Sequence, residues 1–279
     1  MFELDLFEQY KEGNKGIAIV ISIKGGIFVS ENKAAIITGA GSGLGQSAAV
    51  RLAKEGIDIA VVDINEEGGN ETVEMVKQKG VNAIFIKADV SKAEEVKNYV
   101  DKTVEEFGKV DYFFNNAGIS GSGQYFLNTE IEEIEQVVSI NLMGALYGVR
   151  YVAEVMMKNG GGSIVNTASS AGVIGQDSVV TYSATKHGII GLTKSMVAEY
   201  AKEGLRVNAI APGPTETPMV KAFYEANPEM KANATGGIPQ KRLGTPEEVA
   251  ELVTFLLTSK AEYINGEVIR IDGGFTNTK

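Results

Sequence analysis

From Lys33 onward, short runs of β-branched and other apolar residues alternate along the chain with longer segments of helical period. Seven of the short runs have the length and composition of buried strands, at Ala34–Thr38, Ile57–Val62, Ala83–Lys87, Tyr112–Asn115, Ser163–Thr167, Arg206–Ile210 and Val268–Ile271. Six helical segments lie between them, at Gly43–Lys54, Glu66–Lys79, Ala93–Phe107, Ile131–Met157, Tyr182–Glu203 and Pro246–Leu257. Strict alternation of strand and helix is typical of parallel sheets. The pattern therefore predicts an α/β Rossmann fold, a doubly wound parallel seven-stranded sheet with helices on both faces.

Local signals mark the start of two of these helices. Ser91 stands three residues before Glu94, and Thr245 is followed by a proline and two acids that suit the positive end of a helix dipole. We expect Ser91 and Thr245 to cap their helices. The helix from Tyr182 is more apolar than one buried face requires, which favours an additional contact between subunits.

Residues 1–32 precede the first predicted strand as an extension, and residues 33–279 are expected to form a single dinucleotide-binding and catalytic domain. The extension is either a hairpin around Gly25-Gly26 or a disordered arm, and a start codon placed too early would also explain it. Its first residues carry acids where a secretory signal carries basic residues, and the apolar run 16–23 is too short to cross a bilayer. We therefore expect a cytoplasmic protein.

Composition narrows the range of partners. The chain is 44% hydrophobic and 22% charged, as in ordinary soluble globular proteins, and its formal net charge is −10. That charge would repel nucleic acid and anionic lipid, so neither is expected as a partner, although the acidity could simply keep the protein soluble. With no cysteine and one histidine, no metal site is expected.

A glycine-rich segment, Thr38–Gly45, spans the end of the first predicted strand and the start of the first helix, in the pattern T-G-x-x-x-G-x-G. Glycines allow a tight turn and close approach of a pyrophosphate, which the helix N-terminus attracts, although a plain turn is the alternative. Asp63 ends the second strand, where a carboxylate can bind the adenosine ribose hydroxyls and would repel the phosphate of NADP. No Arg or Lys lies inside the loop or just after Asp63, so the sequence predicts NAD. Asp63 capping the next turn is the alternative.

Tyr182 and Lys186 stand four residues apart in a predicted helix, so both side chains fall on one face. An ammonium beside a phenol would lower the pKa of Tyr182 from about 10 toward neutral pH. Ser169 precedes the tyrosine by thirteen residues. Together with the glycine loop, this set predicts a nicotinamide-dependent redox enzyme.

Five segments resemble one enzyme family in their order along the chain: the glycine loop, Asp89-Val90, Asn115–Gly118, the set of Ser169, Tyr182 and Lys186, and Pro212-Gly213 with Thr217. From about Lys33 to Gly274 the chain is similar to the single-domain, NAD-type short-chain dehydrogenases/reductases. Within that family, four segments look most like NAD-linked reductases of cyclic ketones and cyclic diol dehydrogenases: Phe114–Gly118, Asn166–Ser169, Lys186–Gly188 and Asp272–Phe275.

The resemblance implies a set of cofactor-binding residues, namely Gly39, Ser42, Gly43, Leu44, Asp63, Ile64, Asp89, Val90, Asn116, Gly118, Tyr182, Lys186, Thr215 and Thr217. In this set Asp89 and Val90 would hold the adenine, Asn116 and Gly118 would flank the adenosine ribose, and the threonines would meet the nicotinamide carboxamide. Two structural alternatives compete with these roles. Asp89 could cap the following helix, and Asn115-Asn116 could satisfy neighbouring backbone across the sheet.

The resemblance also implies four catalytic residues. Tyr182 would exchange a proton with the substrate oxygen, Ser169 would orient that oxygen, Lys186 would tune the tyrosine and bind ribose, and Asn141 would hold a water in a proton relay. Packed or solvated roles compete for the tyrosine, the lysine and the asparagine. Ser170 is the near rival of Ser169, and the family interval of thirteen residues selects Ser169.

The expected substrate is a small-molecule alcohol or ketone, and the expected cofactor is NAD. The protein itself is expected to form a homotetramer. Substrate choice is assigned to Ser120–Tyr125 and to residues 218–240, which resemble a mobile lid. A non-catalytic NAD-binding sensor of the same fold is the alternative function. A sugar-nucleotide epimerase or dehydratase is disfavoured because no sizeable substrate domain follows the last strand.

Overall fold

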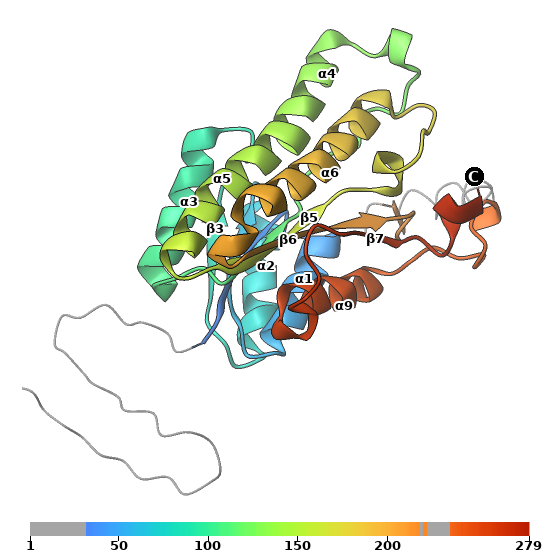
Figure 1. Cartoon of the computed structure of the whole chain (residues 1–279). Helices are drawn as coiled ribbons and strands as arrows, with labels where there is room; N and C mark the ends of the chain where they lie inside the picture. The colour runs from blue at the N-terminus through green and yellow to red at the C-terminus, as the bar shows by residue number, and fades with distance from the viewer. Residues whose placement is uncertain (1–31, 218–219, 222–234, 279) are drawn as a thin grey trace, which may run out of the picture.

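A computed structural model describes residues 32–217, 220–221 and 235–278, and its centre is one sheet of seven parallel strands (Figure 1). The strands are β1 (Ala34–Thr38), β2 (Asp58–Asp63), β3 (Ala83–Lys87), β4 (Tyr112–Asn115), β5 (Gly162–Thr167), β6 (Leu205–Pro212) and β7 (Val268–Ile271). Their order across the sheet is β3-β2-β1-β4-β5-β6-β7, and every pair is parallel. The predicted doubly wound α/β fold is confirmed.

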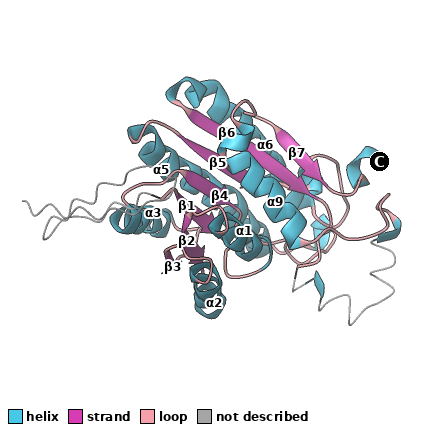
Figure 2. Cartoon of the chain, turned by 90° about the horizontal axis from the view of Figure 1, so that it is seen from below, coloured by secondary structure: helices cyan, strands magenta, loops and turns pink. Residues whose placement is uncertain are grey.

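Helices cover both faces of the sheet. They are α1 (Gly43–Ala53), α2 (Glu66–Lys77), α3 (Ala93–Phe107), α4 (Ile131–Val138), α5 (Gly144–Lys158), α6 (Val180–Tyr200) and α9 (Pro246–Leu257). Figure 1 shows α3, α5 and α6 on one face and α1, α2 and α9 on the other, and Figure 2 shows the strands lying side by side. Because side chains alternate along a strand, Ile37 packs toward α1 and α9, while Ile36 packs toward α3 and α5.

The predicted helical segment Ile131–Met157 is confirmed as helical along its whole length, but it is not one regular α-helix. The structure divides it into α4 and α5, joined by the wider π-helical turn Ser139–Met143. A π-turn inserts one extra residue per turn, a feature often found at functional sites, and apolar periodicity over a long segment does not reveal it.

The two predicted helix caps have different outcomes. Thr245 forms a capping box with Glu248 at the start of α9, as predicted. The prediction for Ser91 is wrong, because α3 begins at Ala93 after Lys92 and has no side-chain cap. The Ser91 hydroxyl instead donates a hydrogen bond to the Asp89 carboxylate at 2.7 Å.

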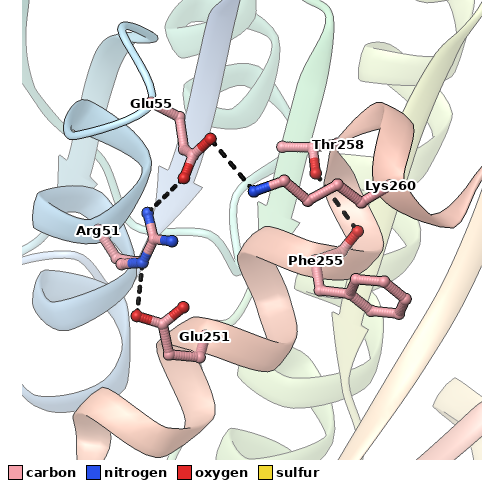
Figure 3. Close-up of polar contacts among 6 residues, drawn as sticks. All are labelled: Arg51, Glu55, Glu251, Phe255, Thr258 and Lys260. Carbon is pink, nitrogen blue, oxygen red and sulfur yellow. Dashed lines mark hydrogen bonds and ion pairs between the residues drawn. The ribbon is translucent and has the colours of Figure 1, made fainter.

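Ion pairs on the solvent side fasten α9 to α1. Arg51 of α1 donates to Glu251 of α9 at 2.6 Å and to Glu55 at 2.8 Å, and Lys260 beyond α9 reaches Glu55 at 3.4 Å (Figure 3). Since α1 follows the glycine loop, these ion pairs hold α9 against the helix that begins at that loop.

The predicted extension, residues 1–32, falls outside the described residues except for Asn32, so the division of the chain at Lys33 stays a prediction. Most of the predicted lid, residues 218–219 and 222–234, also lies outside them. In the described part of the chain, no helix has both the length and the apolar character needed to span a membrane.

Candidate active site

The predicted site residues gather at the carboxyl ends of the strands, around the point between β1 and β4 where the strand order reverses direction. Open α/β sheets bind ligands at such a switch point. The glycine loop follows β1 there. Gly39 and Gly43 have φ values of +64° and +54°, and a Cβ on Gly45 would lie 2.1 Å from the Gly39 carbonyl oxygen. Backbone packing therefore requires glycine at these positions.

The start of α1 is suited to an anion. Its N-cap residue, Ser42, makes no side-chain cap, so its hydroxyl does not occupy the first-turn N–H groups. These donors and the helix dipole favour a pyrophosphate next to Gly43 and Leu44.

Asp63 lies directly beside the glycine loop. Its Oδ2 accepts a hydrogen bond from Gly41 N at 2.8 Å, and its Oδ1 accepts one from Asn65 N at 2.8 Å. A carboxylate has about four lone-pair positions, so each oxygen keeps capacity for a ribose hydroxyl. Ile64, which follows, is 64% exposed. Asp63 does bind the turn that follows it, and it keeps free acceptor positions as well.

A basic residue that no local sequence pattern places there, Lys87, lies beside Asp63 in the sheet. The register of β2 and β3 pairs Asp63 with Lys87, and Lys87 Nζ lies 3.4 Å from Glu66 Oε2 at the start of α2. Asp63 and Lys87 are distant in the sequence and become neighbours only through the pairing of β2 with β3, so residues close to Asp63 along the chain give no sign of this lysine. Among the described residues, Lys87 is the only cation that the strand register places next to Asp63, and it forms an ion pair with Glu66.

At the adenine position, Asp89 is engaged by its own turn. It accepts hydrogen bonds from the backbone N–H and the hydroxyl of Ser91 at 3.0 and 2.7 Å. Burial acts to raise the pKa of Asp89, but these bonds and the ammonium of Lys92 bring the pKa below its ordinary value. Val90 packs against the start of α5, where a Cβ on Gly144 would lie 2.9 Å from Val90 Cγ2.

The two asparagines after β4 connect strands to one another. Asn116 Nδ2 donates to Thr38 O at 3.0 Å, and Asn116 Oδ1 accepts from Thr167 Oγ1 at 3.2 Å. Asn115 Nδ2 donates to Asn166 Oδ1 at 3.0 Å. Both side chains thus bind neighbouring strands, which is the structural role considered as the alternative for Asn115-Asn116. The ribose contact of Asn116 stays a prediction.

Tyr182 and Lys186 lie on one face of α6, as predicted, with Lys186 Nζ 5.4 Å from the centroid of the tyrosine ring. The ammonium donates to the carbonyl oxygen of Thr167 at 2.7 Å and is only 3% exposed. Burial lowers the pKa of Lys186 to about 8. The protein therefore holds a charged amine in a site that disfavours its charge, a pattern common at functional sites.

The predicted lowering of the Tyr182 pKa is not what the chain by itself produces. Burial raises the pKa of Tyr182 above its ordinary value, and a hydrogen bond with the Ser169 hydroxyl acts in the opposite direction. Ser169 Oγ also accepts from Ala171 N at 3.2 Å. The ammonium that was expected to act on the phenol is directed to Thr167, so desolvation of the phenol dominates.

Asn141 lies in the π-helical turn and is fully buried. Its side chain pairs with the backbone of Ile119 in both directions, as Oδ1 accepts from Ile119 N and Nδ2 donates to Ile119 O, each at 2.8 Å. A Cβ on Gly118 would lie 3.0 Å from Asn141 Oδ1 and 3.6 Å from Lys186 Nζ. Gly118 thus marks the place where the asparagine, the lysine and the segment after β4 meet.

The threonines after β6 are held by backbone contacts. Thr215 pairs with Gly244 in an isolated parallel bridge, and its hydroxyl donates to Gly213 O at 3.0 Å. Thr217 N donates to Thr215 O at 2.9 Å. Both residues stand at the same sheet edge as the glycine loop, because all seven strands are parallel.

A small hollow borders Tyr182 on the side of α4. Described residues that line it include Ser120, Gly123, Phe126 and Val180, and the charged residue among them is Glu133. That carboxylate accepts from Ser122 N at 2.7 Å and holds the loop. The predicted substrate segment 120–125 thus contributes to the surroundings of the tyrosine.

Among the described residues no group of three or more His, Cys, Asp or Glu side chains could hold a metal ion. His187 is exposed, and its Nδ1 lies 2.9 Å from Ser183 O, away from the set of Tyr182 and Lys186.

The chain is similar to known oxidoreductases over most of its length. Residues 39–276 match the family model described as enoyl-(acyl carrier protein) reductase. Levodione reductase of Leifsonia aquatica is 42% identical over 250 residues, which cover 87% of this chain and 94% of that protein. Cyclohexanol dehydrogenase of Acinetobacter sp. (strain SE19) is 41% identical over 246 residues, covering 88% and 96%.

Solved structures are similar over the same range. The crystal structure of levodione reductase has a TM-score of 0.84 at 41% identity and covers 88% of this chain and 98% of that one. NAD+-bound xylitol dehydrogenase has a TM-score of 0.83 at 34% identity, covering 87% and 98%. An actinorhodin polyketide ketoreductase with NADPH has a TM-score of 0.85 at 34% identity, covering 90% and 100%. Both forms of the nicotinamide cofactor therefore occur among the structural neighbours.

Proposed function

Because the chain belongs to the short-chain dehydrogenase/reductase family of oxidoreductases, we propose that it transfers a hydride between NAD(H) and a secondary alcohol or its ketone. The observation that carries the proposal is the meeting of Tyr182, Ser169 and Lys186 at the carboxyl edge of the sheet, beside a backbone loop suited to pyrophosphate. When bound, the nicotinamide would supply or accept the hydride.

The residues present fit a dinucleotide. The glycine loop and the start of α1 would hold the pyrophosphate at Gly43 and Leu44, and Asp63 would accept from the adenosine ribose hydroxyls. Thr215 and Thr217 would meet the carboxamide. The remaining members of the proposed cofactor set keep the roles that the family resemblance implies.

In ketone reduction, Tyr182 would donate its hydroxyl proton to the substrate oxygen as the carbonyl carbon becomes an alcohol carbon. Burial raises the pKa of Tyr182, so the phenol carries its proton before the reaction. Ser169 would hydrogen-bond the same oxygen and fix its position. The buried ammonium of Lys186 would stabilise the resulting phenolate. The phenolate would regain its proton from solvent through the proposed relay, in which Asn141 holds a water. Alcohol oxidation reverses these steps.

We assign NAD rather than NADP on the charge of Asp63; the one lysine that the strand register places next to Asp63 among the described residues, Lys87, forms an ion pair with Glu66. We assign a small, uncharged, cyclic substrate on two grounds. The described lining of the hollow beside Tyr182 is largely uncharged, and the relatives named above are levodione reductase and cyclohexanol dehydrogenase.

We also propose that residues 33–279 act as one catalytic domain of a cytoplasmic homotetramer. The predicted helix from Tyr182 carries more apolar residues than one buried face requires, which favours a contact between subunits. Light scattering of the purified protein tests the oligomeric state.

The deciding experiment is Tyr182→Phe, assayed with cyclohexanol and cyclohexanone at the NADH absorbance. Loss of the proton donor should lower kcat by about 10³-fold, while NADH binding followed by fluorescence stays within a few-fold of wild type. Tyr263→Phe, at a fully exposed tyrosine, is the matched control. Substantial turnover by Tyr182→Phe would overturn the mechanism, and NADH binding by a wild type that turns over no member of a wider alcohol and ketone panel would favour the non-catalytic sensor.

A further inference from the structure

The Thr215–Thr217 segment takes its backbone partners from a loop that lies about thirty residues later in the chain. Gly244 N donates to Pro214 O at 3.1 Å, and Glu216 N donates to Gly244 O at 2.8 Å. The isolated bridge of Thr215 with Gly244 is the result. The position of Gly244 therefore sets the position of the segment proposed to meet the nicotinamide.

A single carboxylate fixes the residues on both sides of Gly244. Glu248 Oε1 accepts from Arg242 Nη2 at 2.6 Å, and Oε2 accepts from Arg242 Nη1 at 2.8 Å. Oε2 also accepts from Thr245 N at 2.9 Å, while Arg242 Nη1 donates to Leu243 O at 3.1 Å. A bidentate pair of this kind fixes orientation as well as distance. The hydrogen bonds from Arg242 and Thr245 lower the pKa of Glu248 to about 2, so the carboxylate stays charged at working pH.

The backbone of the same loop is strained. Lys241 has a φ of +55°, a conformation that residues with a side chain rarely adopt. Such a residue persists where its surroundings determine its conformation, and strained positions are frequent at ligand clamps. Lys241 Nζ donates to Gly236 O at 2.7 Å, and Lys241 N donates to Ile238 O at 2.9 Å. The loop is thus held on both sides of Arg242.

We infer that Glu248 and Arg242 are positioning residues that set Thr215–Thr217 for the nicotinamide end of the cofactor, an inference that rests on the proposed function. Neither residue needs to touch the cofactor. Their contribution passes through Gly244, which is tied to Arg242 and Thr245 by the chain and to Pro214 and Glu216 by hydrogen bonds.

The test compares two ligands that share the adenosine and pyrophosphate but differ at the nicotinamide, NADH and ADP-ribose. In Arg242→Met and Glu248→Gln, the Kd for NADH should rise about fivefold, as expected for losing a well-aligned exposed pair, while the Kd for ADP-ribose changes less than about twofold. Glu248→Gln retains an acceptor for Thr245 N, so the cap of α9 and the fold survive. The double variant should match the single ones, because the pair acts as a unit, and Arg242→Lys should fall between.

The matched control is Glu251→Gln, which lies on α9 as Glu248 does and breaks the ion pair with Arg51 of α1 (Figure 3). It should leave the ratio of the two affinities at the wild-type value. Equal weakening of NADH and ADP-ribose in the Arg242 and Glu248 variants, or no change in either, would overturn the inference. Failure of wild type to bind NADH would instead count against the proposed function.

Discussion

The cofactor side of the candidate site, at the ends of β1 and β2, differs from the proton-transfer side, between α6 and β5, in what it buries. The first is built from backbone: a Cβ on Gly45 would lie 2.1 Å from the Gly39 carbonyl oxygen, and the carboxylate of Asp63 stays partly exposed. The second buries an ammonium and an amide, on Lys186 and Asn141. Substitutions in the glycine loop should therefore act through steric fit, and those at the buried polar groups of the second side through desolvation and charge.

The largest effect should come from Lys186→Met, which removes the buried charge. Turnover should fall by about 10³-fold, because the phenolate of Tyr182 loses its cation. Unfolding should nevertheless require more free energy near neutral pH, by roughly 1 to 3 kcal/mol, since the folded protein no longer holds a charge in a desolvated site. Steady-state assays and urea denaturation measure the two quantities.

The pH dependence sharpens this prediction. The pKa of Lys186 is about 8 in the folded protein and about 10.5 when unfolded. Between these values the unfolded chain binds a proton that the folded chain does not, so the wild-type free energy of unfolding should rise with pH from about 8 to 10.5. Lys186→Met should lose that rise. Lys194→Met, at an exposed position of the same helix, should retain it, and an identical slope in all three proteins would contradict the buried charge.

On the cofactor side, Gly45→Ala should have the next largest effect. The added methyl meets backbone rather than a flexible side chain, so the glycine loop must shift, at a cost of about 3 kcal/mol in stability and with loss of NADH binding. Gly191→Ala, inside α6 with no atom within 4 Å of the added Cβ, is the control and should stabilise by about 0.5 to 1 kcal/mol. Thermal unfolding of the two variants should move in opposite directions. Equal behaviour would disprove the steric account.

A smaller change is expected for Asp63→Ala. Without the carboxylate that opposes the NADP phosphate, the ratio of kcat/KM for NADP to that for NAD should rise about tenfold. Adding Glu66→Gln should raise the ratio further, because it releases Lys87 from its pair beside Asp63. Initial rates with both cofactors measure it, with Asp101→Ala at the surface as control. An unchanged ratio would mean that Asp63 does not select the cofactor.

The smallest effect should come from Tyr99→Phe, in the core between α3 and α5. The Tyr99 hydroxyl is buried and has no hydrogen-bond partner among the described residues. Removing it should change the free energy of unfolding by between 0 and about +1 kcal/mol and leave turnover unchanged. A clear destabilisation in urea would show that the hydroxyl has a partner.

The parts of the site that were predictable depend on short-range geometry. Tyr182 and Lys186 share a face because four residues nearly complete one helical turn, and the Thr38–Gly45 loop could be assigned because glycine spacing reports local backbone needs. The alternation of strands and helices predicted the sheet for the same reason. Amphipathic periodicity did not show the π-turn around Asn141, because one extra residue in a turn hardly changes the pattern over a long helix.

The sequence by itself determined the α/β fold, the strand and helix order, the glycine loop and the shared face of Tyr182 and Lys186, all of which follow from residues close together in the chain. Only the tertiary structure decided that Lys87 lies beside Asp63, that Asn141 pairs with Ile119, and that Gly244 supports Thr215. It also decided the balance of pKa values, because burial of Tyr182 and Lys186 outweighs their proximity. Strand register and desolvation are properties of the packed molecule, and no local pattern of residues encodes them.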